Sequence, residues 1–78
     1  MVQVITKFNV GDRVTTFDNK TRKAIDFTVG CIGVHIGKDY KSVTYYPVDE
    51  SGRTCYEDSH EEDLCFATKE ELLDYVAR

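Results

Sequence analysis

The sequence predicts a mainly β fold, a small barrel of about five bent antiparallel strands followed by a short C-terminal α-helix. Three observations favour this class. Runs of β-prone residues alternate with turn residues over most of the chain, the alternation of one long run changes parity, and a helix-capping sequence opens the last segment. Because 78 residues can bury only one hydrophobic core, we expect a single domain over residues 1–78.

Turn residues divide the first two thirds of the chain into short strands. The expected strands are a first one that follows a turn at Gly11-Asp12 and ends near Phe17, a second one through residues 27–36, a third one over 43–48 and a short fourth one at 53–56. A polar loop through about Lys23 separates the first two strands. Pro47 cannot donate to a β-ladder, so the third strand is expected to end near it or to lie at an edge.

The second strand contains the most informative pattern. Its apolar residues take odd positions from 27 to 31 and even positions from 32 to 36, and the change falls between Gly30 and Gly33. Strand side chains alternate with a period of two, so such a change indicates an extra residue in the strand or burial of both faces. Glycines at this place favour a bulge or a sharp bend. We therefore expect the strand to bend at Gly33 and to belong to two parts of the barrel.

The segment after the fourth strand is strongly polar. Residues 57–63 are too polar to be buried and are expected to form a loop. Leu64 and Phe66 are then expected to re-enter the apolar interior.

A capping box predicts the C-terminal helix. Thr68 and Glu71 have the spacing in which the threonine hydroxyl accepts from the Glu71 amide and the Glu71 carboxylate reaches back. The expected helix, residues 69–77, is too short to be stable alone and must dock on the sheet. Its expected docking stripe consists of Leu72, Leu73 and Val76.

Four short segments, taken in order over about residues 8–66, carry a resemblance: Phe8-x-Val10-Gly11-Asp12-x-Val14, Gly33-Val34-x-Ile36, Val43-x-Tyr45 and Glu62-Asp63-Leu64. Together they resemble the SH3-like small β-barrels of the KOW and Tudor-like type. The resemblance implies binding of nucleic acid, methylated lysine, proline-rich peptides or other proteins. Residues 63–73, Asp-Leu-x-x-Ala-Thr-x-Glu-Glu-Leu-Leu, are similar to the ends of small uncharacterised bacterial and phage proteins.

Composition indicates where the chain works. No apolar run approaches the roughly 18 residues that span a bilayer, and the N-terminal residues lack the pattern of a secretory leader. Three cysteines are an odd number without framework spacing, which fits a reducing compartment. We therefore expect a cytoplasmic protein.

The candidates for metal binding and catalysis are weak. The metal-ligand types are Cys31, His35, Cys55, His60 and Cys65, and none forms the close pair typical of zinc sites. Cys31 and Cys65 are better explained as core residues. A nucleophile–base set can be written from Cys55 and His60, but so short a chain offers no deep cleft. The sequence thus predicts no metal, no cofactor and no enzymatic activity.

Charge favours a protein partner. Residues 1–48 carry seven Lys or Arg and four Asp or Glu, whereas residues 49–78 carry three and ten. The densest acidic cluster and the nearby aromatic residues predict a surface that binds a basic protein. Its residues are Glu57, Asp58, Glu61, Glu62 and Asp63, whose charge steers the partner, and Tyr46 and Tyr56, which anchor it. The alternative is a KOW-like module that binds nucleic acid through Lys20, Arg22, Lys23, Lys38 and Lys41. A sequence pI of about 5.0 disfavours that alternative.

Overall fold

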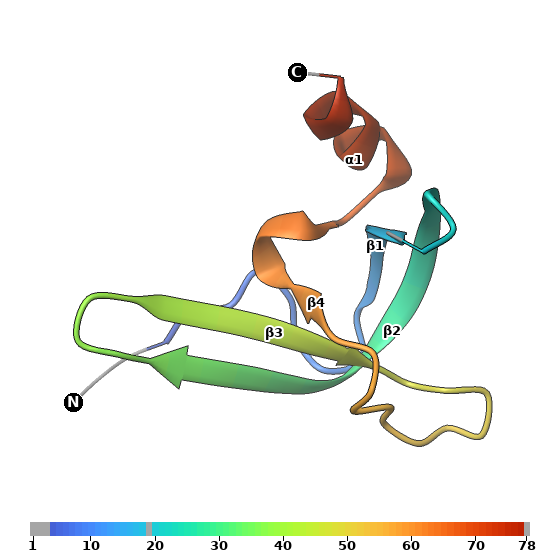
Figure 1. Ribbon diagram of the computed structural model, residues 1–78. Helices are drawn as coiled ribbons and strands as arrows, with labels where there is room; N and C mark the ends of the chain where they lie inside the picture. Colours follow the sequence, from blue (N-terminus) through green and yellow to red (C-terminus); the bar gives the residue numbers. More distant parts are fainter. Residues whose placement is uncertain (1–3, 19, 78) are drawn as a thin grey trace.

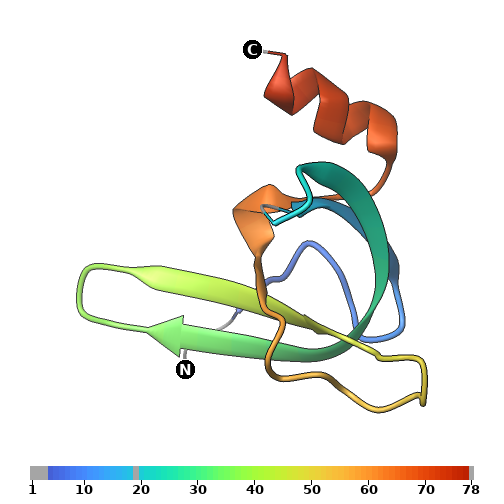
Figure 2. The ribbon, with the colours of Figure 1, turned by 45° about the vertical axis from the view of Figure 1, so that its right-hand side comes forward.

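The computed structural model describes residues 4–18 and 20–77 (Figure 1). Its strands are β1 (Arg13–Asp18), β2 (Lys23–Ile36), β3 (Lys41–Pro47), β4 (His60–Glu61) and β5 (Cys65–Phe66). They pair antiparallel in the order β4-β3-β2-β1-β5, with the 3₁₀ turn η1 (Glu62–Leu64) between β4 and β5 and helix α1 (Lys69–Val76) at the end. The sheet curls into a half-barrel (Figures 1 and 2), which confirms the predicted class of bent antiparallel strands with a short C-terminal helix.

Strand β2 bends and serves two neighbours, as its parity change predicts. Residues 23–28 pair with β1, and the rest of the strand pairs with β3. The register shifts between Val29 and Cys31, so Gly30 is the extra residue that flips the following side chains to the other face. The prediction that Gly33 marks the bend is wrong, because Gly33 pairs regularly with Thr44.

Close packing explains why the bulge falls on Gly30. A Cβ atom at this position would lie 2.7 Å from Thr54 Oγ1 and 2.9 Å from Val48 Cγ2. The segment after β3 therefore crosses directly over the Gly30 backbone. At Gly33 the nearest atom to such a Cβ belongs to the half-buried ring of Tyr46, at 3.1 Å.

The hydrophobic core lies inside the curl of the sheet. It consists of Val14, Phe27, Val29, Val43, Tyr45 and Cys65, with Phe8 and Ile32 packed against it. Leu64 does not enter this core as the sequence predicted, and Phe66 does so only in part. Cys65 pairs with the buried Thr16 and is fully buried, whereas Leu64 is exposed and Phe66 only half-buried.

A polar network ties the N-terminal segment to this core. The Tyr45 hydroxyl donates to Glu62 Oε2 at 2.6 Å and accepts from the Phe8 amide at 3.2 Å. The same Glu62 oxygen accepts from the Lys7 amide at 3.0 Å, and Lys7 Nζ donates to the Cys65 carbonyl at 3.0 Å. Burial and the hydrogen bond to Glu62 raise the pKa of Tyr45 to about 12, so the hydroxyl stays protonated as the donor.

The segment between β3 and β5 differs from expectation. Residues 53–56 form no regular strand, and only an isolated bridge joins Thr54 to Val48. The expected loop over residues 57–63 instead contains β4 and most of η1. Because its side chains are polar, sequence patterning offered no sign that this segment pairs with β3.

Helix α1 begins as predicted. Thr68 is its N-cap, with the Thr68 hydroxyl accepting from the Glu71 amide at 3.2 Å, while Glu71 Oε2 accepts from the Ala67 amide at 3.1 Å. The docking stripe is narrower than expected: Leu72 is 2% exposed, but Leu73 and Val76 are 53% and 58% exposed. Leu72 is thus the buried residue of the helix, and the Tyr75 ring adds a contact with Phe66, at 5.3 Å between ring centroids. Within the described residues, no helix is long and apolar enough to cross a membrane.

Replacing Thr68 with alanine is expected to lower the free energy of unfolding by about 1 kcal/mol, because the Glu71 amide loses its acceptor. Urea unfolding followed by far-ultraviolet circular dichroism measures the change. Thr68→Ser keeps the hydroxyl and should retain most of the stability. Equal losses in the two variants would contradict a capping role.

Candidate functional site

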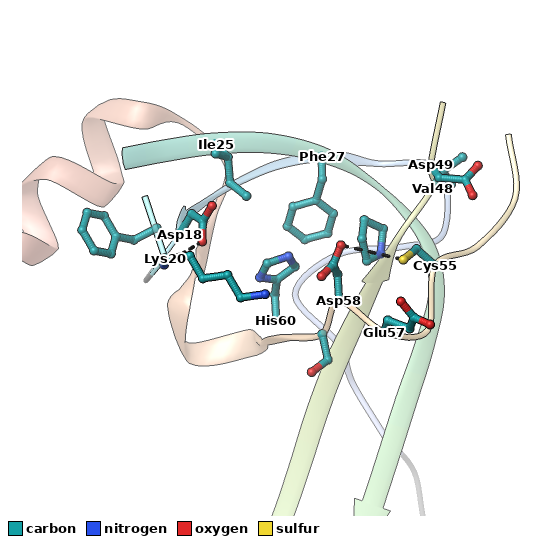
Figure 3. Close-up of a pocket in the computed structure, with 13 residues that line it drawn as sticks. Asp18, Lys20, Ile25, Phe27, Val48, Asp49, Cys55, Glu57, Asp58 and His60 are labelled. Carbon is teal, nitrogen blue, oxygen red and sulfur yellow. Dashed lines mark hydrogen bonds between the residues drawn. The ribbon is translucent and has the colours of Figure 1, made fainter. Parts of the chain in front are cut away.

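A pocket of about 500 Å³ lies between the end of β1, the start of β2 and the loop that joins β3 to β4 (Figure 3). Its lining residues are Phe17, Asp18, Lys20, Ile25, Phe27, Pro47, Val48, Asp49, Cys55, Glu57, Asp58, Ser59 and His60. We call it the acidic pocket. It combines apolar walls with a rim of carboxylates, and it lies within the size range of small-ligand sites, about 300–1,000 Å³.

The walls of the acidic pocket come from the inner face of the sheet. Phe27 belongs to the core, and His60 pairs with Tyr45 and so shares its inward-facing side. The imidazole of His60 stacks on the Phe27 ring, with ring centroids 4.7 Å apart and an interplanar angle of 30°. Burial lowers the pKa of His60, and the nearby carboxylates of Asp58 and Asp18 only partly oppose this effect. The pocket therefore presents a neutral, planar ring at pH 7.

Four carboxylates surround these walls. Asp18 accepts from the Lys20 amide and from the Thr21 hydroxyl, both at 3.0 Å, and these hydrogen bonds lower its pKa. Asp49 accepts from the Ser51 hydroxyl at 2.6 Å and from two backbone amides, and its pKa is lowered as well. The other two are Glu57 and Asp58. Among the lining residues that the structure describes, Lys20 is the single Lys or Arg, so negative charge dominates.

The acidic cluster predicted from the sequence divides into two groups. Glu57 and Asp58 line the acidic pocket. The remaining members line a second hollow of about 240 Å³ beside β3, together with Lys41, Ser42 and Val43: they are Glu61, Glu62 and Asp63. Glu62 also bonds to Tyr45 and Lys7, so it holds the fold together. The five acidic residues of the predicted partner surface therefore line two different hollows.

The two tyrosines predicted for partner binding lie in contact. The rings of Tyr46 and Tyr56 have centroids 5.4 Å apart and are tilted by 53°. Tyr46 is half-buried on the outer face of β3, opposite the inward-facing Tyr45, and Tyr56 is 67% exposed. Tyr56 stands between the pocket-lining residues Cys55 and Glu57. Sequence alternation correctly predicted that Tyr46 points away from the core. The contact between Tyr56 and Tyr46 depends on the fold and could not be predicted from alternation.

The five basic residues of the nucleic-acid alternative do not gather. Lys20, Arg22 and Lys23 lie where β1 turns into β2, whereas Lys38 and Lys41 lie at the turn between β2 and β3. These two turns are at opposite ends of the 14-residue strand β2 (Figure 1). The cations thus form two separate small groups, and Lys20 belongs to the lining of the acidic pocket.

The pocket also contains functional candidates that sequence reasoning missed. Asp18 and Asp49 are 31 positions apart in the chain, and Ile25 and Phe27 read as ordinary strand residues. They line one pocket because β2 curves over the loop after β3 (Figure 3). No sequence signal distinguishes these residues, because each one is ordinary for the turn or strand in which it lies.

Cysteine and histidine residues form no catalytic set in the described parts of the chain. Cys55 Sγ donates to Asp58 Oδ2 at 3.7 Å, and its partner is thus a carboxylate and not His60. Burial raises the pKa of the Cys65 thiol to about 11. The three thiols are free, and in residues 4–18 and 20–77 no three His, Cys, Asp or Glu side chains are grouped to hold a metal ion. Cys31 is half-buried on the strand face that carries Tyr46, which corrects its assignment to the core.

The stability of the protein is expected to fall as pH is lowered from 7.5 to 5.5. The pKa of His60 in the folded state lies below its ordinary 6.5, so in this range the unfolded chain binds more protons than the folded one. Asp18 and Asp49 stay ionised at these pH values, because their pKa values lie below 3.8. Urea unfolding at both pH values measures the loss. His60→Phe, which keeps a ring on Phe27, should reduce the pH dependence, and His35→Gln at the exposed end of β2 should leave it as it is; the reverse pattern would refute the assignment.

Comparison with known proteins adds no further constraint on this site. No protein-family model, no curated protein and no solved structure matches the chain.

Proposed function

We propose that this protein is a non-enzymatic interaction module that binds a basic segment of another protein. The observation that carries the proposal is the contact between the exposed Tyr56 and the half-buried Tyr46, with Tyr56 next in sequence to the pocket carboxylates Glu57 and Asp58. Membership of the SH3-like barrels is part of the same proposal, supported by the curled five-stranded sheet and the bent β2. We also propose that the protein acts in the cytoplasm, as an accessory protein of a bacterium or a phage.

Charge and aromatic groups have separate parts in the proposed complex. Surface carboxylates accelerate the encounter with a basic partner, and this effect weakens as salt screens it. Buried aromatic anchors slow dissociation, because a partner that leaves must re-expose apolar surface to water. Glu57 and Asp58 supply the first effect, and Tyr56 supplies the second by extending the ring surface of Tyr46.

An NMR titration of the labelled protein tests this function with three probes: a short peptide of lysine, glycine and serine, its glutamate counterpart, and a DNA duplex. We expect the lysine peptide to shift the amides of Tyr46 and of residues 54–60, more strongly at low salt. Shifts confined to the duplex, at residues 20–23 or 38–41, would overturn the proposal in favour of nucleic-acid binding, since phosphate contacts weaken steeply with salt.

Variants separate the two effects in a stopped-flow measurement with the same lysine peptide. Glu57→Gln with Asp58→Asn should lower the association rate several-fold and flatten its salt dependence. Asp39→Asn with Glu70→Gln removes the same charge from exposed positions outside the pocket and should change the rate less. Tyr56→Ala should raise the dissociation rate, whereas Tyr40→Ala, at a comparably exposed tyrosine, should not. Equal effects in the paired variants would contradict the proposed surface.

A further inference from the structure

One cation of the protein itself already lies at the acidic pocket. Lys20 lines the pocket, and its side chain extends toward the His60 ring (Figure 3). Lys20 is exposed and belongs to the turn between β1 and β2. Its one positive charge only partly balances the four carboxylates of the pocket lining.

We propose that the acidic pocket receives a single arginine side chain of the basic partner, and that Lys20 must move aside when it enters. The inference rests on the proposed function and names the group that the partner presents. It concerns the inner pocket of Asp18, Phe27, Asp58 and His60, and it does not depend on the outer Tyr46–Tyr56 pair.

The shape and chemistry of the walls favour this occupant. Ile25, Phe27 and Pro47 offer apolar surface to the methylene stem of a long basic side chain. The uncharged His60 ring, held by its stack on Phe27, offers a flat surface against which a planar guanidinium can lie. Asp18 and Asp58 flank that ring and supply acceptors for the guanidinium N–H groups (Figure 3).

Arginine suits this pocket better than lysine. A guanidinium is planar, more weakly hydrated than an ammonium, and donates in several fixed directions at once. An ammonium gives up more of its hydration, and because it is not planar it gains less from the flat ring. The chain's own Lys20 is therefore a weak occupant that a stronger one can displace.

Three peptides that differ only in their basic positions test the inference: arginine, lysine and the neutral arginine isostere citrulline, each spaced by glycine and serine. Isothermal titration calorimetry measures their affinities for the full chain. We expect the arginine peptide to bind about fivefold or more tightly than the citrulline peptide, and also more tightly than the lysine peptide. Asp58→Asn should remove most of this preference, with the fold checked by NMR.

Lys20→Gln gives the sharpest readout. It should strengthen binding of the arginine peptide by about two- to fivefold, because the competing cation is gone, and leave the citrulline peptide unaffected. Lys23→Gln makes the same change in charge at a residue outside the pocket lining and should have the smaller effect. A decrease in affinity for Lys20→Gln, or equal gains in both variants, would overturn the displacement of Lys20.

The outcomes also distinguish this inference from the function on which it rests. If the arginine and lysine peptides bind equally and shift only Tyr46 and Tyr56, the interaction module stands and the arginine pocket is overturned. If none of the three peptides binds, both are overturned.

Discussion

Replacing Tyr45 with alanine is expected to lower the free energy of unfolding by about 3–5 kcal/mol, the range for deleting a large aromatic side chain from a core. Tyr45 is 0% exposed and packs edge to face against Phe8, with ring centroids 5.8 Å apart. Small domains have only about 5–15 kcal/mol of stability, so the variant should lose a large share of it and melt at a clearly lower temperature. Thermal and urea unfolding measure the loss.

Tyr45→Phe separates the hydroxyl from the ring. Loss of the hydroxyl leaves the Phe8 amide without an acceptor and removes a donor from Glu62. We expect the free energy of unfolding to fall by about 1–2 kcal/mol. Tyr40→Phe, at an exposed tyrosine, should stay within about 0.5 kcal/mol of the wild type. A Tyr45→Phe variant as stable as that control would show that the network does not hold the N-terminal segment.

Gly30→Ala is expected to cost about 1–3 kcal/mol, because the added methyl group overlaps two short branched side chains that have little room to move. The new Cβ would lie 2.7 Å from Thr54 Oγ1 and 2.9 Å from Val48 Cγ2, both closer than van der Waals contact. Urea unfolding measures the free energy, and native-state hydrogen exchange should locate the loosening at residues 48–54.

Gly33→Ala is the matched control on the same strand. There the new methyl group meets the half-buried Tyr46 ring at 3.1 Å, which can shift by a few tenths of an ångström. The reduced flexibility of the unfolded chain offsets that strain, so the change should stay within about 1 kcal/mol. A larger cost at Gly33 than at Gly30 would place the bend where the sequence alone predicted it.

Local patterns in the sequence were sufficient for the main elements of the fold. The parity change in residues 27–36 predicted a bent strand shared by two neighbours, because a two-residue period records any inserted residue. The capping box located the start of α1 at Thr68, because the hydrogen bonds of a cap join residues only three apart. Both signals lie within a few consecutive residues, so they can be recognised in a single sequence without the tertiary structure.

The sequence did not correctly predict those elements that have only weak local signals. Strand β4 has two residues, His60 and Glu61, and its polar side chains resemble those of a loop. The choice between Gly30 and Gly33 depended on which one lies beneath Val48 and Thr54, which is a contact between distant segments. Likewise, Leu64 is exposed because its neighbour Cys65 faces inward and pairs with Thr16, and nothing in residues 64–66 indicates that pairing.

The sequence by itself determined the class of the fold, the bent second strand, the capped helix and the residues from which an acidic and aromatic surface is built. Only the tertiary structure decided how those residues are grouped: Glu57 and Asp58 join Asp18 and Asp49 around one pocket, while Glu62 is drawn into a hydrogen bond with Tyr45. The physical reason is that alternation and capping depend on neighbours within a few residues, whereas a pocket depends on how far β2 curves and where the loop after β3 crosses it.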